Sequence, residues 1–144
     1  MVDIYKSGIE EDPMRKKLHH IGIVLPSMEA ANEFLDKFGF EKESVSYTES
    51  NESYFIFTKA LEGEPPLEIM VPTGGVLAAY NKGKGGIHHI AIEVEDVEAV
   101  SREFEAKGLQ MLYEEASRPV DHVLCNFVRP KYGNGILVEF IQNI

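Results

Sequence analysis

Hydrophobic and polar residues alternate along residues 18–24, and this period of two predicts a β-strand. Pro26 ends the strand, and the side chain of Ser27 can cap the first turn of a following helix. The apolar residues of that helix recur every three or four positions and so share one face: Ala31, Phe34, Leu35 and Phe38. Gly39 supplies the left-handed residue at which helices commonly end.

The rest of the chain repeats this order. Further strands are predicted at 41–48, 53–59 and 66–71. The second copy predicts a strand at 87–94, a helix capped by Asp96 and ended by Gly108, and strands at 109–114, 123–129 and 136–142. Each half is therefore βαβββ, which predicts the α+β fold class. We expect a polar N-terminal extension at 1–17, a first module at 18–72, a linker helix and Gly-rich loop at 73–86, and a second module at 87–144.

An internal repeat underlies this pattern, because residues 18–40 align with residues 87–109 without a gap. Seven positions are identical: His19/His88, His20/His89, Ile21/Ile90, Ile23/Ile92, Glu29/Glu98, Ala30/Ala99 and Gly39/Gly108. Two copies of this length indicate a fused pair of modules rather than a solenoid. Packing of the copies about a pseudo-twofold axis would bring equivalent side chains together.

Strand alternation separates the two histidines of each pair. His20 and His89 share their strand faces with the small residues Gly22 and Ala91, whereas the preceding histidine of each pair lies on an isoleucine face. A face lined by Gly and Ala leaves room for a ligand. We therefore predict that His20 and His89 bind a metal and that the preceding histidines pack or support them. The competing interpretation is that all four are half-buried structural histidines.

Two glutamates stand at equivalent positions late in each half. Glu68 follows His20 by 48 residues, and Glu139 follows His89 by 50 residues. Each interrupts an apolar strand, where an ionised carboxylate costs several kcal/mol unless it is paired or metal-bound. Two imidazoles and two carboxylates suit a divalent metal. A carboxylate exposed to solvent or paired with Lys or Arg is the alternative.

Composition narrows the classes of partner. The chain has 144 residues, of which 44% are hydrophobic, and this suits one domain or two half-domains that share a core. A net charge of −10, spread along the chain, argues against nucleic acid as a partner. No apolar run approaches the ~20 residues of a membrane span, and the N-terminus lacks the apolar core of a signal peptide. The single cysteine, Cys125, predicts a reducing cytoplasm.

The repeat and its His-Glu-His-Glu order resemble the vicinal oxygen chelate superfamily, also called the glyoxalase/bleomycin-resistance fold, over residues 18–142. The stretches GGIHHIAIEVEDVEAVSREFEAKGLQML and NFVRPKYGNGILVEFIQ are most similar to methylmalonyl-CoA epimerases. The resemblance implies two βαβββ modules forming an incomplete barrel around one divalent ion, which is cobalt, manganese, nickel, zinc or iron. It implies a homodimer, and it implies four metal ligands: His20, Glu68, His89 and Glu139.

The resemblance also implies an activity, the metal-dependent removal of a proton next to a carbonyl through an enolate, as in the epimerisation of methylmalonyl-CoA or a similar acyl-CoA. Glu139, Glu68 and Glu52 are the candidate bases, and Arg129 with Lys131 could bind a CoA phosphate. The epimerase pattern commonly has Gln at the position of Glu68, and a glutamate there is what glyoxalase I shows. A glyoxalase I-type lactoylglutathione lyase and a non-catalytic small-molecule-binding protein of the same fold therefore stay open.

Overall fold

The computed structural model describes residues 15–144 and forms two compact units within them. The N-terminal unit is His20–His89, and the C-terminal unit combines residues 15–19 with Ile90–Ile144. Two strands, β1 (Arg15–Val24) and β5 (Gly86–Val94), contribute residues to both units. Most of the polar extension expected at 1–17 lies outside the described residues, and β1 begins at Arg15 rather than at Leu18.

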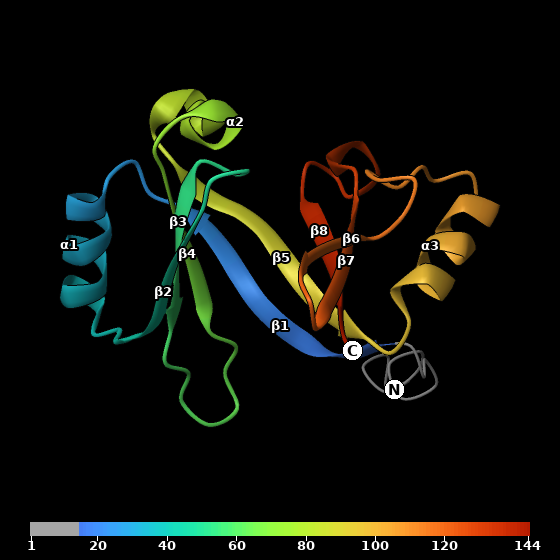
Figure 1. The fold of residues 1–144 in the computed structure, drawn as a ribbon, viewed down its shortest axis with the longest axis horizontal. Helices are drawn as coiled ribbons and strands as arrows, with labels where there is room; N and C mark the ends of the chain where they lie inside the picture. Colours follow the sequence, from blue (N-terminus) through green and yellow to red (C-terminus); the bar gives the residue numbers. More distant parts are fainter. Residues whose placement is uncertain (1–14) are drawn as a thin grey trace, which may run out of the picture. The chain divides into compact units, whose positions relative to one another are not determined.

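The N-terminal unit is a mixed sheet with one long helix beside it (Figure 1). After β1 its elements are α1 (Met28–Phe38), β2 (Lys42–Thr48), β3 (Ser53–Thr58), β4 (Leu67–Pro72), α2 (Gly75–Ala78) and the 3-10 turn η1 (Tyr80–Gly83). The hydrogen-bonded order is β2-β3-β4-β1. β1 runs parallel to β4, and the other pairs are antiparallel. The parallel pair requires a crossover connection, which α1 begins.

Both predicted caps of α1 are confirmed. The Ser27 hydroxyl oxygen accepts a hydrogen bond from the Ala30 N–H at 3.0 Å, and Gly39 has a φ of 75°. The helix buries its apolar face in a cluster formed by Ala31, Leu35, Ile56, Ile69 and Val71. Phe38, predicted on that face, is instead 60% exposed and contacts the ring of Phe34 at the end of the helix.

The C-terminal unit repeats the arrangement, with α3 beside the strands β6, β7 and β8 in Figure 1. After β5 its elements are α3 (Val97–Ala106), β6 (Ser117–Val120), β7 (Val123–Val128), the 3-10 turn η2 (Pro130–Tyr132) and β8 (Leu137–Asn143). The hydrogen-bonded order is β5-β8-β7-β6. Asp96 caps α3 as predicted, because its carboxylate accepts from the Ala99 N–H at 3.0 Å. A cluster of Val94, Val97, Val100, Met111, Val128 and Phe140 fills the space under the helix.

The strand predicted at 109–114 is wrong. This segment makes only an isolated bridge between Met111 and Val128, and the strand forms later, as β6. The cause is the side chain of Asn126, which forms hydrogen bonds that a neighbouring strand would otherwise provide. Asn126 on β7 is 1% exposed; its amide oxygen accepts from the Tyr113 N–H at 3.1 Å, and its amide N–H donates to the Tyr113 carbonyl at 3.0 Å. Because Asn126 satisfies both backbone groups of Tyr113, the chain leaves the sheet at that point.

The α+β fold class is confirmed, and the remaining predicted strands agree with the structure to within three residues at each end. The predicted linker is α2 followed by η1, which ends at Gly83 before β5. Among residues 15–144, no helix has the length and apolar character needed to cross a membrane.

Candidate metal and active site

Three of the predicted ligands meet inside the N-terminal unit, each on a different strand. His20 comes from β1, Glu68 from β4 and His89 from β5. The Nε2 atoms of His20 and His89 are 3.0 Å apart. The Glu68 Oε1 atom lies 3.6 Å from Nε2 of His20 and 3.5 Å from Nε2 of His89. One atom of each side chain therefore points toward a common centre.

The pairing of β1 with β4 produces this arrangement. Gly22 is the register partner of Glu68, and paired residues in a sheet project from the same face. His20 lies two residues before Gly22 and so shares that face. The face is thus set by alternation, as the sequence predicts, and its buried members are His20, Gly22 and Val24.

Gly22 makes room for His89 itself. A Cβ atom added at Gly22 would overlap the His89 imidazole at Cε1, Nδ1 and Nε2. The small residue at position 22 is predicted to leave space for a ligand, whereas in the structure that space holds the side chain of His89, itself a candidate metal ligand. Any side chain at position 22 would displace the ring and with it the Nε2 atom.

The cluster is dry. His20 is 2% exposed, His89 is 4% exposed, and the side chain of Glu68 is 14% exposed. The ring of Phe57 stands edge-on to His20 with the centroids 5.6 Å apart, and Phe57 is also the register partner of Glu68. In such surroundings a carboxylate is stable only beside groups that balance its charge.

These donors fit a divalent metal ion. Adjacent ligands of an octahedral ion, each at about 2.1 Å, lie about 3.0 Å from one another. The observed separations of 3.0, 3.5 and 3.6 Å between the three donor atoms are close to that spacing. Two imidazoles with a carboxylate are the donor set that suits the later first-row divalent metals.

Glu139, the fourth predicted ligand, is a buried residue of β8 in the C-terminal unit, 7% exposed. Its register repeats that of Glu68: Glu139 is paired with Phe127 as Glu68 is paired with Phe57. The repeat seen in the sequence therefore extends to the backbone pairing around both acids. Its position as a metal ligand stays a prediction.

Tyr113 is a residue near Glu139 that the sequence analysis missed. Burial raises the pKa of its phenol above the usual 10.0, and the charges of Cys125 and Glu139 raise the pKa further. The ring stands edge-on to Phe127 at 6.0 Å between centroids. Tyr113 lies in the segment wrongly predicted as a strand. Its position near Glu139 could not be predicted from the sequence, because it depends on the hydrogen bonds that Asn126 makes with the Tyr113 backbone.

Glu52, a predicted base, occupies the β2–β3 turn at the far end of the hairpin. Since Phe57 is paired with Glu68, Glu52 lies five residues along β3 from that pair, about 16 Å of strand length. Its carbonyl accepts from the Thr73 N–H at 2.7 Å and from the Thr73 hydroxyl at 3.0 Å. Its φ of 50° and these bonds describe a residue that shapes the turn.

The predicted phosphate-binding pair lies on the β7–β8 connection. Arg129 precedes η2 in an extended conformation, and its Nε atom is buried with no hydrogen-bond partner among the described residues. Lys131 is exposed, with its ammonium group 5.0 Å from the centre of the Tyr132 ring. The two predicted phosphate-binding cations therefore share one connection, where a nitrogen of Arg129 is buried and Lys131 is exposed to solvent.

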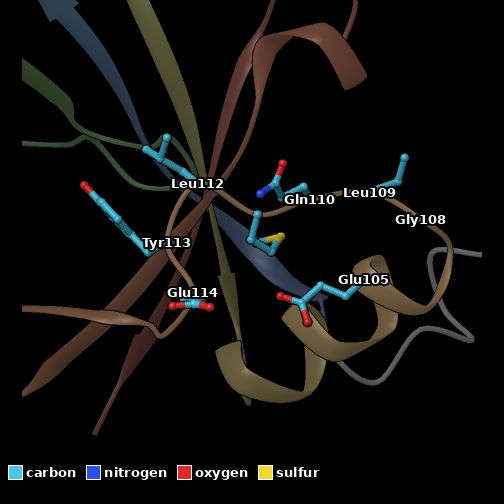
Figure 2. Close-up of a pocket in the computed structure, with 8 residues that line it drawn as sticks. Glu105, Gly108, Leu109, Gln110, Leu112, Tyr113 and Glu114 are labelled. Carbon is cyan, nitrogen blue, oxygen red and sulfur yellow. The ribbon is translucent and has the colours of Figure 1, made fainter.

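A depression in the C-terminal unit has a volume of about 610 Å³ and is formed by α3 and the segment that follows it (Figure 2). Its lining residues are Glu105, Gly108, Leu109, Gln110, Met111, Leu112, Tyr113 and Glu114. The two ionisable acids in this set, Glu105 and Glu114, make it unsuited to an anionic ligand. None of the predicted site residues lines it.

Changing Gly22→Ala tests the packing of His89. We expect the variant to lose about 1–3 kcal/mol of unfolding free energy, because the new methyl group overlaps the imidazole. In a His89→Ala background the same change should cost nothing, and it should even stabilise the strand by about 0.5–1 kcal/mol through the lower chain entropy of alanine. Urea denaturation of the four proteins measures both effects. Equal costs in the two backgrounds would contradict the proposed overlap.

Absorbance titration of the phenolate tests the environment of Tyr113. The difference between the wild type and Tyr113→Phe should show a midpoint above 10.0, since burial and neighbouring negative charge disfavour the phenolate. The neutral phenol stabilises the fold below pH 10, and this contribution is lost as the pH rises through the raised pKa. A midpoint at or below 10.0 would show that Tyr113 is solvated.

Comparison with known proteins identifies the family to which the chain belongs. Residues 19–127 match the family model described as the glyoxalase/bleomycin resistance protein/dioxygenase superfamily. The mitochondrial methylmalonyl-CoA epimerase of Homo sapiens is 30% identical over 132 residues, which are 88% of this chain and 73% of the relative.

Solved structures of methylmalonyl-CoA epimerases are also similar to this chain. The methylmalonyl-CoA epimerase of Mycobacterium tuberculosis has a TM-score of 0.80 at 25% identity, covering 91% of this chain and 90% of that chain. A Streptomyces coelicolor methylmalonyl-CoA epimerase variant in complex with 2-nitronate-propionyl-CoA has a TM-score of 0.77 at 27% identity, covering 90% and 98%. The chain therefore belongs to the glyoxalase/bleomycin resistance protein/dioxygenase superfamily, and its similarity within that superfamily is to methylmalonyl-CoA epimerases.

Proposed function

We propose that this protein is a metal-dependent enzyme that removes the proton next to a carbonyl and epimerises methylmalonyl-CoA or a similar acyl-CoA. The observation that carries the proposal is the convergence of two buried histidines, His20 and His89, with the half-buried Glu68, with one donor atom each at 3.0–3.6 Å from the others. The similarity to epimerases supports the reaction class.

We propose Glu139 as the fourth ligand. Its support is the repeat, because Glu139 and Glu68 are both paired with a phenylalanine on the neighbouring strand and both lie in apolar surroundings. A divalent ion held by these residues would supply a Lewis acid for the carbonyl of the substrate. Which divalent ion is bound stays open, since imidazole and carboxylate donors accept cobalt, manganese, nickel, zinc and iron.

The proton steps belong to carboxylates of the chain. Epimerisation needs one group to take the α-proton from one side of the carbon and another to return a proton on the opposite side. Glu68 and Glu139, which come from different halves of the repeat, are the acids that we assign to these roles. Glu52 is the weaker candidate, because its backbone shapes the β2–β3 turn at a distance from Glu68 along the hairpin.

Arg129 and Lys131 are the groups that we assign to the substrate's carrier. A CoA thioester carries several negative charges, and the chain as a whole has a net charge of −10, so local cations must provide the attraction. The Streptomyces coelicolor relative binds 2-nitronate-propionyl-CoA, which makes an acyl-CoA the first substrate to test. The homodimer and the cytoplasmic location expected from the sequence stay predictions.

A glyoxalase I-type lyase acting on a hemithioacetal is the second candidate. The observation in its favour is that position 68 holds a glutamate, an acid that can both bind metal and take a proton. Both reactions move a proton beside a chelated carbonyl group, so the same residues could serve either. The relatives described above are epimerases, so the support for the lyase is limited to the residue at position 68.

Deuterium exchange from solvent into the α-carbon of methylmalonyl-CoA tests the proposed reaction. We expect exchange in the presence of added Co²⁺ or Mn²⁺ and none after chelation. His89→Ala should lose most of the bound metal and the exchange together, because it removes one of the donors. Metal analysis and mass spectrometry measure the two quantities, and His122→Ala, a change at an exposed histidine of the β6–β7 turn, is the matched control.

Full metal content in His89→Ala would place the metal elsewhere. Absence of metal-dependent exchange in the wild type would overturn the epimerase proposal. Turnover of the methylglyoxal–glutathione hemithioacetal by the same preparation would then favour the lyase.

Amide substitutions identify the base. We expect Glu52→Gln to leave the exchange rate close to that of the wild type, and Glu68→Gln to retain metal while the rate changes, because only Glu68 lies at the donor cluster. Single-turnover exchange rates measured at saturating metal separate proton transfer from metal loss. A fall of about a hundredfold in Glu52→Gln, the usual cost of losing a general base, would instead assign the second base to Glu52.

A further inference from the structure

We propose that His88 is a positioning residue that fixes His89 with its Nε2 lone pair directed at the metal-binding centre. This inference rests on the proposed metal site and adds a residue outside the four proposed ligands. His88 precedes His89 on β5 and is half-buried. The sequence predicts that His88 packs against or supports His89, and its ring contact with His89 favours support.

The contact joins the two Nδ1 atoms, which are 2.9 Å apart. The rings are nearly perpendicular, at 88°, with their centroids 5.2 Å apart. A hydrogen bond between two neutral imidazoles needs one N–H donor and one lone-pair acceptor. The Nε2 atom of His89 must present its lone pair if it is to bind a metal, so its proton resides on Nδ1. That N–H then donates to Nδ1 of His88, and His88 carries its own proton on Nε2.

The same assignment agrees with the other side of the His89 ring. There Nε2 lies 3.0 Å from Nε2 of His20, where a lone pair on His89 can accept the N–H of His20 when no ion is bound. One hydrogen bond at Nδ1 therefore settles which ring nitrogen faces His20 and Glu68. Histidine ligands of metals commonly donate their second N–H in this way, and loss of the acceptor weakens binding.

His88 is itself held in place by the loop before β5. The ring of Tyr80 stands edge-on to it with the centroids 4.9 Å apart. The Tyr80 hydroxyl donates to the Ile87 carbonyl at 2.6 Å, and the Asn81 amide donates to the Gly85 carbonyl at 2.6 Å. These bonds attach η1 to the start of β5. The acceptor that His89 uses is thereby part of a supported structure, not a free surface side chain.

Two substitutions separate positioning from packing. His88→Phe keeps a ring against Tyr80 but removes the acceptor, whereas His88→Gln removes the ring and restores an acceptor through its amide oxygen. His122→Gln is the matched control, since His122 is exposed in the β6–β7 turn. His88→Leu serves as a second variant without an acceptor if His88→Phe does not fold, as judged by circular dichroism.

Two readouts are measured, and the first needs no metal. Long-range proton–nitrogen spectra of the metal-free proteins report the tautomer of His89, and we expect a single Nδ1–H form in the wild type, His88→Gln and His122→Gln, and a mixture in His88→Phe. Titration calorimetry with Mn²⁺ or Co²⁺ gives the Kd, which should rise about 10–100-fold in His88→Phe. His88→Gln should recover most of that loss.

An unchanged tautomer and an unchanged Kd in His88→Phe would overturn the proposal. Equal losses in His88→Phe and His88→Gln would do so as well, because they would assign His88 to packing alone. If the wild type binds neither ion, the proposed metal function fails, while the spectra of the metal-free proteins still decide whether His88 sets the tautomer of His89.

Discussion

The parallel pairing of β1 with β4 is the constraint on which the site depends. It sets Gly22 opposite Glu68, so that His20 and Glu68 project from the same face of the sheet. A parallel pair cannot be closed by a tight turn, and α1 with the β2–β3 hairpin forms the connection. The caps and the buried face of α1 therefore have a consequence beyond their own stability. They hold a register in which a slip of one residue would turn Glu68 away from the imidazoles.

Much of the fold could be predicted from the sequence, because strand periodicity and helix capping depend on residues that are close together in the chain. The period of two over 18–24 separated His20 from its neighbour, and burial of His20 and His89 in the structure agrees with that separation. Ser27 and Asp96 cap their helices by bonds that involve only the next three residues. The internal repeat also predicted that Glu68 and Glu139 are equivalent acids, which the hydrophobic pattern of a single strand could not show. The strand registers agree with this equivalence.

The features that the sequence analysis missed depend on contacts between residues far apart in the chain. The segment 109–114 has a strand-like pattern, but Asn126 on β7 bonds both backbone groups of Tyr113 and removes it from the ladder. Composition gives no sign that one amide will do this. The turn at Glu52 likewise depends on Thr73, which lies after β4. Alternation predicted that His88 packs against or supports His89, and only the contact between the two Nδ1 atoms distinguishes these two roles.

The fit between Gly22 and His89 also bears on how such a chain can change over evolutionary time. The two positions are coupled, because a side chain at position 22 lowers the stability of the fold as long as residue 89 is histidine. The order of substitutions is therefore biased: replacement of the glycine costs less once the imidazole has been lost. In a lineage that abandons the metal, position 22 is released from selection and becomes free to fill the vacated space. A relative with a side chain at position 22 and a smaller residue than histidine at position 89 would then be expected to lack this metal site.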